Sequence, residues 1–179
     1  MFRQQGYANA RLSDIAGRAG MQTGSLYHHF TSREELVAEI LHLGIQTVWS
    51  HVRTAVDALP ADATPVERVA AAIRAHTICV LEINDYASAQ TRIVGQVPPA
   101  IAITHRDDRR AYGDYWHALL VDADDAGVLA PGLDLFTARM LCFGAMNWTA
   151  EWFDVRRGLA AFDVADHAVA VLLAGLTGT

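Results

Sequence analysis

Four hydrogen-bonding side chains lie close together near the start of the chain: Thr23, Ser25, Tyr27 and His28. In a helix over residues 23–29 they would face outward, because Leu26 and Phe30, four residues apart, would form the inward side. A solvated helix face usually carries Glu and Lys, whereas this one carries hydroxyl and imidazole groups. Such groups hydrogen-bond phosphates and base edges, so the pattern predicts a surface that binds duplex DNA.

Two flanking helices would hold this segment in position. The first has small apolar residues at three- and four-residue steps, namely Leu12, Ile15, Ala16 and Ala19. Gly20 would end it, because glycine accepts a left-handed backbone. After the segment, Ser32 and Glu35 have the spacing of a capping box that opens a long helix. Residues 6–36 therefore predict a helix-turn-helix unit.

The sequence of this unit resembles the DNA-binding domain of TetR-family transcriptional repressors. The matching residues are Phe2, Gly6, Tyr7, Asp14–Ala16, Ala19, Gly20, Gly24, Leu26–Phe30 and Arg33–Leu36. The rest of the chain agrees with the family in length and helical character, though more weakly in sequence. The resemblance implies a repressor that binds palindromic operator DNA as a homodimer and is released by a small hydrophobic effector.

The resemblance also implies roles for single residues. Tyr27 and His28 match positions that contact phosphates, and Thr23 and Ser25 match positions that reach the major groove. Arg33 takes the place of a basic residue that pairs with phosphate. The candidate DNA-binding residues are therefore Arg11, Gln22, Thr23, Ser25, Tyr27, His28 and Arg33.

Three departures from the family pattern stand out. Ala10 replaces the Thr that usually caps the second helix, where Asn9 or Arg11 would have to substitute. Gln22 replaces the Ser that usually caps the recognition helix, a role open to Thr23. The chain begins near the end of the family's first helix, so either residues precede it or the three-helix domain is incomplete.

The charge of the chain is divided unevenly. The net charge is −6, which is unusual for a protein that binds DNA. Residues 1–33, however, contain four arginines and one aspartate, a net charge of +3, and the remainder carries −9. One basic end is expected if that end meets phosphate, and its modest charge suggests that two copies bind together.

Helical periodicity and cap signals continue along the chain and predict an all-α fold. The expected helices span about 33–59, 64–83, 85–95, 100–124, 134–157 and 163–176. We expect a helix-turn-helix domain over residues 1–45 and a helical effector-binding and dimerisation domain over residues 46–179, joined by the long helix. Cys79 and Cys142 lie in apolar segments and are expected to be reduced and buried in a cytoplasmic protein without a membrane span.

The second domain is expected to hold an effector pocket. The candidate lining residues are Trp49, His76, Tyr86, Tyr112, Trp116, Phe143, Asn147 and Trp148. His76, Asn147 and Thr149 are polar groups inside apolar helices, and burial requires a ligand or a neighbouring side chain as partner. The Asn147–Thr149 segment, followed by Trp152 and Phe153, resembles the C-terminal domain of family members that sense acyl-CoA thioesters. In that case the CoA phosphates would meet Arg92, Arg106, Arg109 or Arg110; the rival is a neutral hydrophobic ligand.

The last two helices are the expected dimer interface, because two operator half-sites require two reading heads. The candidate interface residues are Trp152, Phe153, Ala168, Val171, Leu172 and Leu176. Alternatively, these apolar faces fill the core of the monomer. An enzyme is not expected, and neither is a cofactor or a metal, because metal-ligand spacings, glycine-rich phosphate loops and nucleophile elbows are absent from the sequence. The remaining alternative is a helical interaction protein that does not bind DNA.

Overall fold

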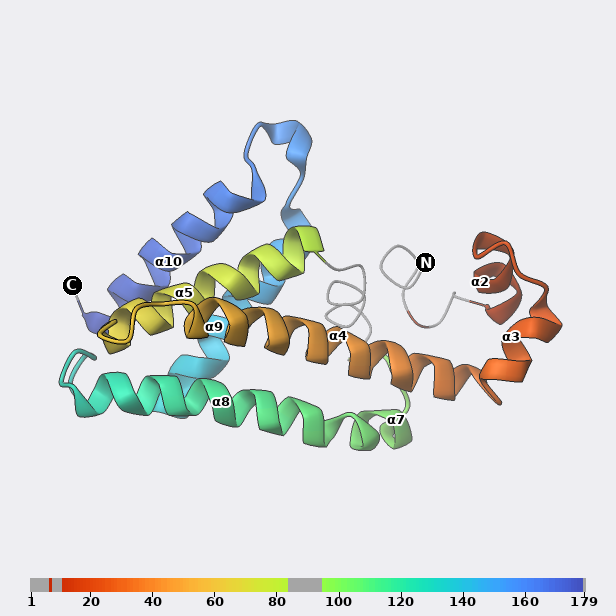
Figure 1. Ribbon diagram of the computed structural model, residues 1–179, viewed down its shortest axis with the longest axis horizontal. Coiled ribbons are helices and arrows are strands. Elements are labelled where there is room, and N and C mark those ends of the chain that lie inside the picture. Colours follow the sequence, from red (N-terminus) through yellow and green to blue (C-terminus); the bar gives the residue numbers. More distant parts are fainter. Residues whose placement is uncertain (1–6, 8–10, 84–94, 179) are drawn as a thin grey trace.

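The computed structural model describes Tyr7, residues 11–83 and residues 95–178, and every regular element among them is helical (Figure 1). In chain order these are α2 (Leu12–Arg18), α3 (Thr23–His29), α4 (Arg33–Asp57), α5 (Pro65–Ile78), the π-helical turn η1 (Cys79–Ile83), α7 (Pro99–Thr104), α8 (Arg106–Asp125), α9 (Leu135–Trp152), the 3-10 turn η2 (Val155–Arg157) and α10 (Ala161–Thr177). The predicted all-α fold is confirmed. The expected helix over 85–95 and the family's first helix fall largely on residues outside this description.

The helix-turn-helix forms as the spacing predicted. α2 and α3 pack around a small apolar cluster of Leu12, Ala16, Leu26 and Leu36. Gly20 adopts the left-handed backbone that the turn requires, with φ of 68°. Ala19 was expected on the apolar stripe but is exposed, because α2 ends at Arg18 and the chain already turns there.

The long helix α4 connects this unit to the rest of the molecule, as Figure 1 shows. Its first turn is capped by Ser32, whose side chain accepts a hydrogen bond from the backbone N–H of Glu35 at 3.1 Å. The Glu35 carboxylate accepts from Thr31 rather than from Ser32, so the predicted capping box is present in one direction only. The boundary near residue 45 stays a prediction; the main apolar cluster of the helical body begins at Ile45.

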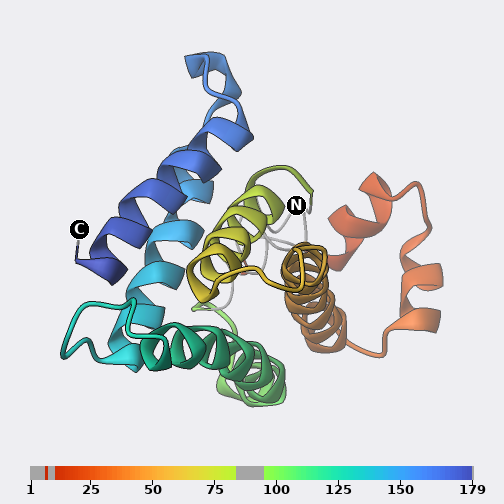
Figure 2. The same cartoon turned by 60° about the vertical axis from the view of Figure 1, so that its left-hand side comes forward.

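The helical body is built around α5. This helix contacts α4, α8, α9 and α10, and Figure 2 shows it between α4 on one side and α9 and α10 on the other. Thr64 and Glu67 form the complete capping box that the sequence predicted, with Pro65 in the first turn. The core contains fully buried Trp116 and the free thiols of Cys79 and Cys142. Burial raises the pKa of both thiols to about 11, so they are protonated at neutral pH.

Three helix ends differ from the sequence prediction. The helix expected over 100–124 is divided at His105 into α7 and α8. α9 ends at Trp152 rather than at Arg157, because Phe153 is extended and the Asp154 side chain caps a separate turn through the N–H of Arg156. Asp163 lies inside α10 and accepts from the N–H of Ala160, which is the actual N-cap. None of the helices described here has the length and apolar character needed to cross a bilayer.

Candidate functional site

The outer face of α3 is open to solvent. Tyr27 is 52% exposed, Ser25 and His28 are exposed, and Thr23 is partly exposed. Leu26 is buried and Phe30 packs against the same cluster, as the four-residue spacing predicted. The structure therefore presents a polar helix face of the kind that enters a DNA groove, and the role of each side chain in binding stays a prediction.

The residues that flank this face are arranged less simply. Neither Arg11 nor Gln22 makes a side-chain cap bond at the helix that it precedes. Arg33 is partly buried: its guanidinium donates to the carbonyl oxygen of Tyr7 and lies 4.1 Å from the centre of the Tyr7 ring. The described position of Arg33 thus serves contact within the domain, whereas the sequence assigned it to phosphate.

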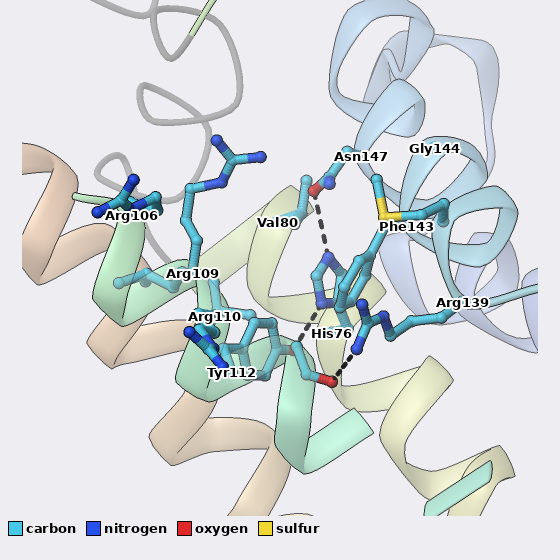
Figure 3. A pocket seen from close by; sticks show the side chains of 14 residues that line it. His76, Val80, Arg106, Arg109, Arg110, Tyr112, Arg139, Phe143, Gly144 and Asn147 are labelled. Carbon is cyan, nitrogen blue, oxygen red and sulfur yellow. Dashed lines mark hydrogen bonds between the residues drawn. The ribbon is translucent and has the colours of Figure 1, made fainter. Parts of the chain in front are cut away.

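A cavity of about 670 Å³ lies in the helical body between α4, α5, α8 and α9 (Figure 3). The residues that line it are Ile45, Val48, His76, Val80, Arg106, Arg109, Arg110, Tyr112, Gly113, Arg139, Met140, Phe143, Gly144 and Asn147. Most of the wall is apolar, which suits a hydrophobic group. The polar lining residues form two separate features: a neutral hydrogen-bonded cluster and a group of arginines.

The neutral cluster consists of His76, Tyr112 and Asn147. His76 Nε2 lies 3.2 Å from the Asn147 side-chain oxygen, and His76 Nδ1 lies 2.8 Å from the Tyr112 hydroxyl. An amide oxygen only accepts, so Nε2 carries the proton and Nδ1 accepts from Tyr112. Burial lowers the pKa of His76 to about 4, and the imidazole is therefore neutral at pH 7.

The arginines come from two helices. Arg106, Arg109 and Arg110 extend from α8, and Arg139 approaches from α9 (Figure 3). Arg139 is anchored by a 2.6 Å hydrogen bond from Nη1 to the Gly113 carbonyl oxygen. No Asp or Glu occurs among the described residues that line the cavity. The cavity is therefore electropositive and suited to an anion.

The structure brings together part of the predicted pocket and rearranges the rest. His76, Tyr112, Phe143 and Asn147 line the cavity, as do three of the arginines that were expected near phosphate. Trp116 is instead a core residue, Trp49 packs against the core outside the lining, and Trp148 is 64% exposed on the surface. Tyr86 and Arg92 lie outside the described residues.

The sequence left open what pairs with the polar residues His76, Asn147 and Thr149. In the structure their partners are side chains and backbone groups of the same chain. Thr149 donates to the Met146 carbonyl oxygen at 2.6 Å, and His76 and Asn147 bind each other. Sequence reasoning did not find Arg139. The signal that pointed to Asn147, a polar residue inside an apolar helix, applies to Arg139 as well. Arg139 lies four positions before Phe143 and eight positions before Asn147, so helical spacing places all three on one side of α9.

An apolar face on α9, α10 and the segment between them is uncovered in the single chain. It includes Leu141, Trp148 and Trp152 of α9, Val155 and Leu159 between the helices, and Phe162 and Val171 of α10, each at least 43% exposed. Among the predicted interface residues, Leu176 is buried in the core, and Ala168 and Leu172 pack against it. Phe153 is partly exposed. Exposed apolar side chains of this number and size make α9 and α10 a candidate interface, and the dimer contact of each residue stays a prediction.

A metal site requires several ligand side chains grouped around one point. Groups of three or more His, Cys, Asp or Glu arranged to hold a metal ion are absent from the described residues.

Comparison with known proteins matches both parts of the chain. Residues 1–40 match the family model described as bacterial regulatory proteins, tetR family, and residues 62–176 match the model of the tetracyclin repressor-like C-terminal domain. The HTH-type transcriptional repressor KstR2 of Mycobacterium tuberculosis is 28% identical over 182 residues, which cover 99% of this chain and 88% of KstR2.

Two solved structures extend the comparison. The ketosteroid transcriptional regulator KstR2 of Mycobacterium tuberculosis has a TM-score of 0.82 and 25% identity, covering 99% of this chain and 89% of that one. AibR, solved in complex with isovaleryl coenzyme A and operator DNA, has a TM-score of 0.80 and 23% identity, covering 96% and 91% of the two chains.

Proposed function

Because the chain belongs to the TetR family of DNA-binding transcriptional regulators, we propose that it represses transcription as a homodimer and releases its operator when a CoA thioester enters the cavity. The family match favours this function over that of a helical interaction protein that does not bind DNA. The exposed apolar face of α9 and α10 supports the homodimer, since two copies could bury it between them.

The observation that carries the choice of effector is the lining of the cavity. An apolar wall and four arginines match two parts of a CoA thioester, the acyl group and the phosphate groups of CoA. The cavity volume of about 670 Å³ is within the range of roughly 300–1,000 Å³ that is common for ligand sites. A neutral hydrophobic ligand would leave the arginines of α8 without a function in binding.

The relatives support the same class of effector. AibR was crystallised in complex with isovaleryl coenzyme A and operator DNA, so at least one protein of this fold binds a CoA thioester. The likeness at 23% identity concerns the fold alone, and the identity of the acyl group is not carried over from it. KstR2 is named as a ketosteroid regulator, which is consistent with a bulky apolar group.

The proposal is tested by isothermal titration of the purified protein with isovaleryl-CoA, octanoyl-CoA and stearoyl-CoA, and with CoA and each free acid separately. At least one thioester should bind more tightly than both of its halves, and it should lower operator affinity in an anisotropy assay. A free acid that binds as tightly as its thioester would instead indicate a neutral or simple lipid effector.

A pair of substitutions locates the phosphates. The double variant Arg106→Ala/Arg109→Ala should weaken thioester binding by roughly fivefold to 30-fold, since each exposed arginine contributes about 1 kcal/mol or less. The same variant should bind the free acid as the wild type does. Arg53→Ala removes an exposed arginine of α4 outside the cavity lining and is the matched control.

A further inference from the structure

Asp108 joins α8 to the helix that leads to the DNA-binding unit. One of its carboxylate oxygens lies 2.7 Å from Nδ1 of His42, and the other accepts from Gln46 Nε2 at 3.2 Å. Both partners belong to α4, whose first turns pack in the helix-turn-helix. Asp108 therefore fixes the start of α8 to α4 by two polar contacts.

A second candidate partner for Asp108 lies at the N-terminal end of its own helix, α8. His105, at the junction of α7 and α8, is 3% exposed, and neither of its ring nitrogens has a hydrogen-bond partner. Its Nδ1 is only 4.0 Å from the Asp108 carboxylate. A buried imidazole without a partner is unfavourable, so a short movement of Asp108 toward His105 would replace one interaction with another.

The same turns of α8 carry the arginines of the cavity. Arg106 and Arg109 flank Asp108 in sequence and line the cavity, whereas Asp108 faces α4. Phosphates that attract the two arginines would draw the start of α8 toward the cavity. Because Asp108 belongs to the same rigid turns, that movement would strain its contacts with α4.

We propose that Asp108 is a two-partner switch, which binds His42 of α4 when the cavity is empty and His105 of its own helix when an anionic effector is bound. The inference rests on the proposed function, because it requires an effector with phosphates. In this proposal His42, His105 and Asp108 couple the cavity to the helix-turn-helix. A coupling of this kind needs an element with two discrete arrangements, which the two histidines supply.

Two substitutions with opposite effects test the switch. His42→Ala removes the α4 partner, so it should weaken operator binding without effector and tighten thioester binding. His105→Phe removes the other partner, so it should weaken thioester binding and leave operator binding without effector nearly unchanged, because the empty protein already holds the His42 contact. The operator affinity of His42→Ala and the thioester affinities of both variants should change by roughly fivefold or more, and the two thioester affinities should move in opposite directions. His117→Ala, on the exposed side of α8, is the control and should change neither.

The measurements are operator anisotropy and thioester calorimetry, with the thioester of the panel above that the wild type binds most tightly. A variant that is merely destabilised loses both affinities, which overturns the switch if both variants behave so. If none of the thioesters binds, the proposed effector is wrong, and the switch is then judged from the operator affinities measured without effector. Equal operator affinities for His42→Ala and His105→Phe overturn the switch.

NMR titration of the wild type provides a readout without substitution. The hydrogen bond that His42 donates to the Asp108 carboxylate raises the pKa of His42, with Glu39 of α4 adding to the effect. His105 faces Asp108, Arg109 and His42, and burial lowers its pKa. A saturating thioester should therefore lower the pKa of His42 and raise that of His105. Unchanged titration of both rings with bound thioester would refute the exchange of partners.

Discussion

Replacement of His76 by Phe should change how the protein responds to acid. The neutral imidazole of His76 is held between Tyr112 and Asn147 in the buried centre of the helical body. Its pKa is about 4 in the folded protein, against 6.5 for an ordinary histidine. The unfolded chain therefore binds a proton between pH 6.5 and pH 4 that the folded protein does not.

The sign and size follow from linkage. The free energy of unfolding falls as the pH drops below 6.5, because protons favour the unfolded chain, and the fall ends near pH 4. At ~1.4 kcal/mol per pH unit, the loss over this window is roughly 3 kcal/mol. His76→Phe removes this loss, but it also removes the hydrogen bonds that His76 makes with the Tyr112 hydroxyl and the Asn147 oxygen, at about 1–3 kcal/mol each at every pH.

The assay is urea unfolding of wild type and variant between pH 7.5 and 4.5, at one protein concentration because a dimer would couple stability to concentration. The variant should be less stable at pH 7.5, and the difference should shrink by roughly 2–3 kcal/mol on going to pH 4.5. His117→Gln removes an exposed imidazole as a control. A difference between wild type and His76→Phe that stays constant over this window would refute the neutral buried imidazole.

Two further predictions concern the surfaces of the molecule. Tyr27→Phe or His28→Ala should weaken operator binding equally for all operator sequences, since the resemblance assigns both residues to phosphate; anisotropy against base-substituted operators would reveal a changed preference instead. Val171→Glu, at a side chain that is 71% exposed on α10, should shift the protein toward monomer in analytical ultracentrifugation and lower operator affinity, whereas an unchanged dimer would move the interface elsewhere.

The sequence was sufficient for the elements whose signals are local. Leu26 and Phe30 fixed the inward side of α3, Gly20 the turn, and Thr64 with Glu67 the start of α5. Each of these depends on residues within four positions of one another, so that periodicity and cap chemistry determine them. The C-terminal end of α9 was missed because the extended Phe153 and the cap at Asp154 have no comparable pattern.

The cavity could be predicted only in part, because it depends on contacts between distant segments. His76 and Asn147 are 71 positions apart, and nothing local indicates that they bind each other. Aromatic residues illustrate the limit: Phe143 and Trp148 lie in the same apolar helix, yet Phe143 lines the cavity and Trp148 faces solvent, whereas Trp116 of the charged helix α8 fills the core. Helical spacing gives the relative side of each residue on its helix, and only packing of α4, α5, α8 and α9 determines which side meets the cavity.

The charged stretch at the start of α8 shows why exposure alone does not define a role. A run such as His105 to Arg110 is expected on a solvated face, and Arg106, Arg109 and Arg110 are indeed exposed. Yet these arginines border the cavity, Asp108 binds α4, and His105 is buried without a hydrogen-bond partner. In a merely solvated run every side chain would be hydrated, whereas here adjacent residues border the cavity, bind α4 or are buried. Because they share two helical turns, a ligand that moves one of them must disturb the others, which makes this stretch the natural place for the cavity and the reading head to be coupled.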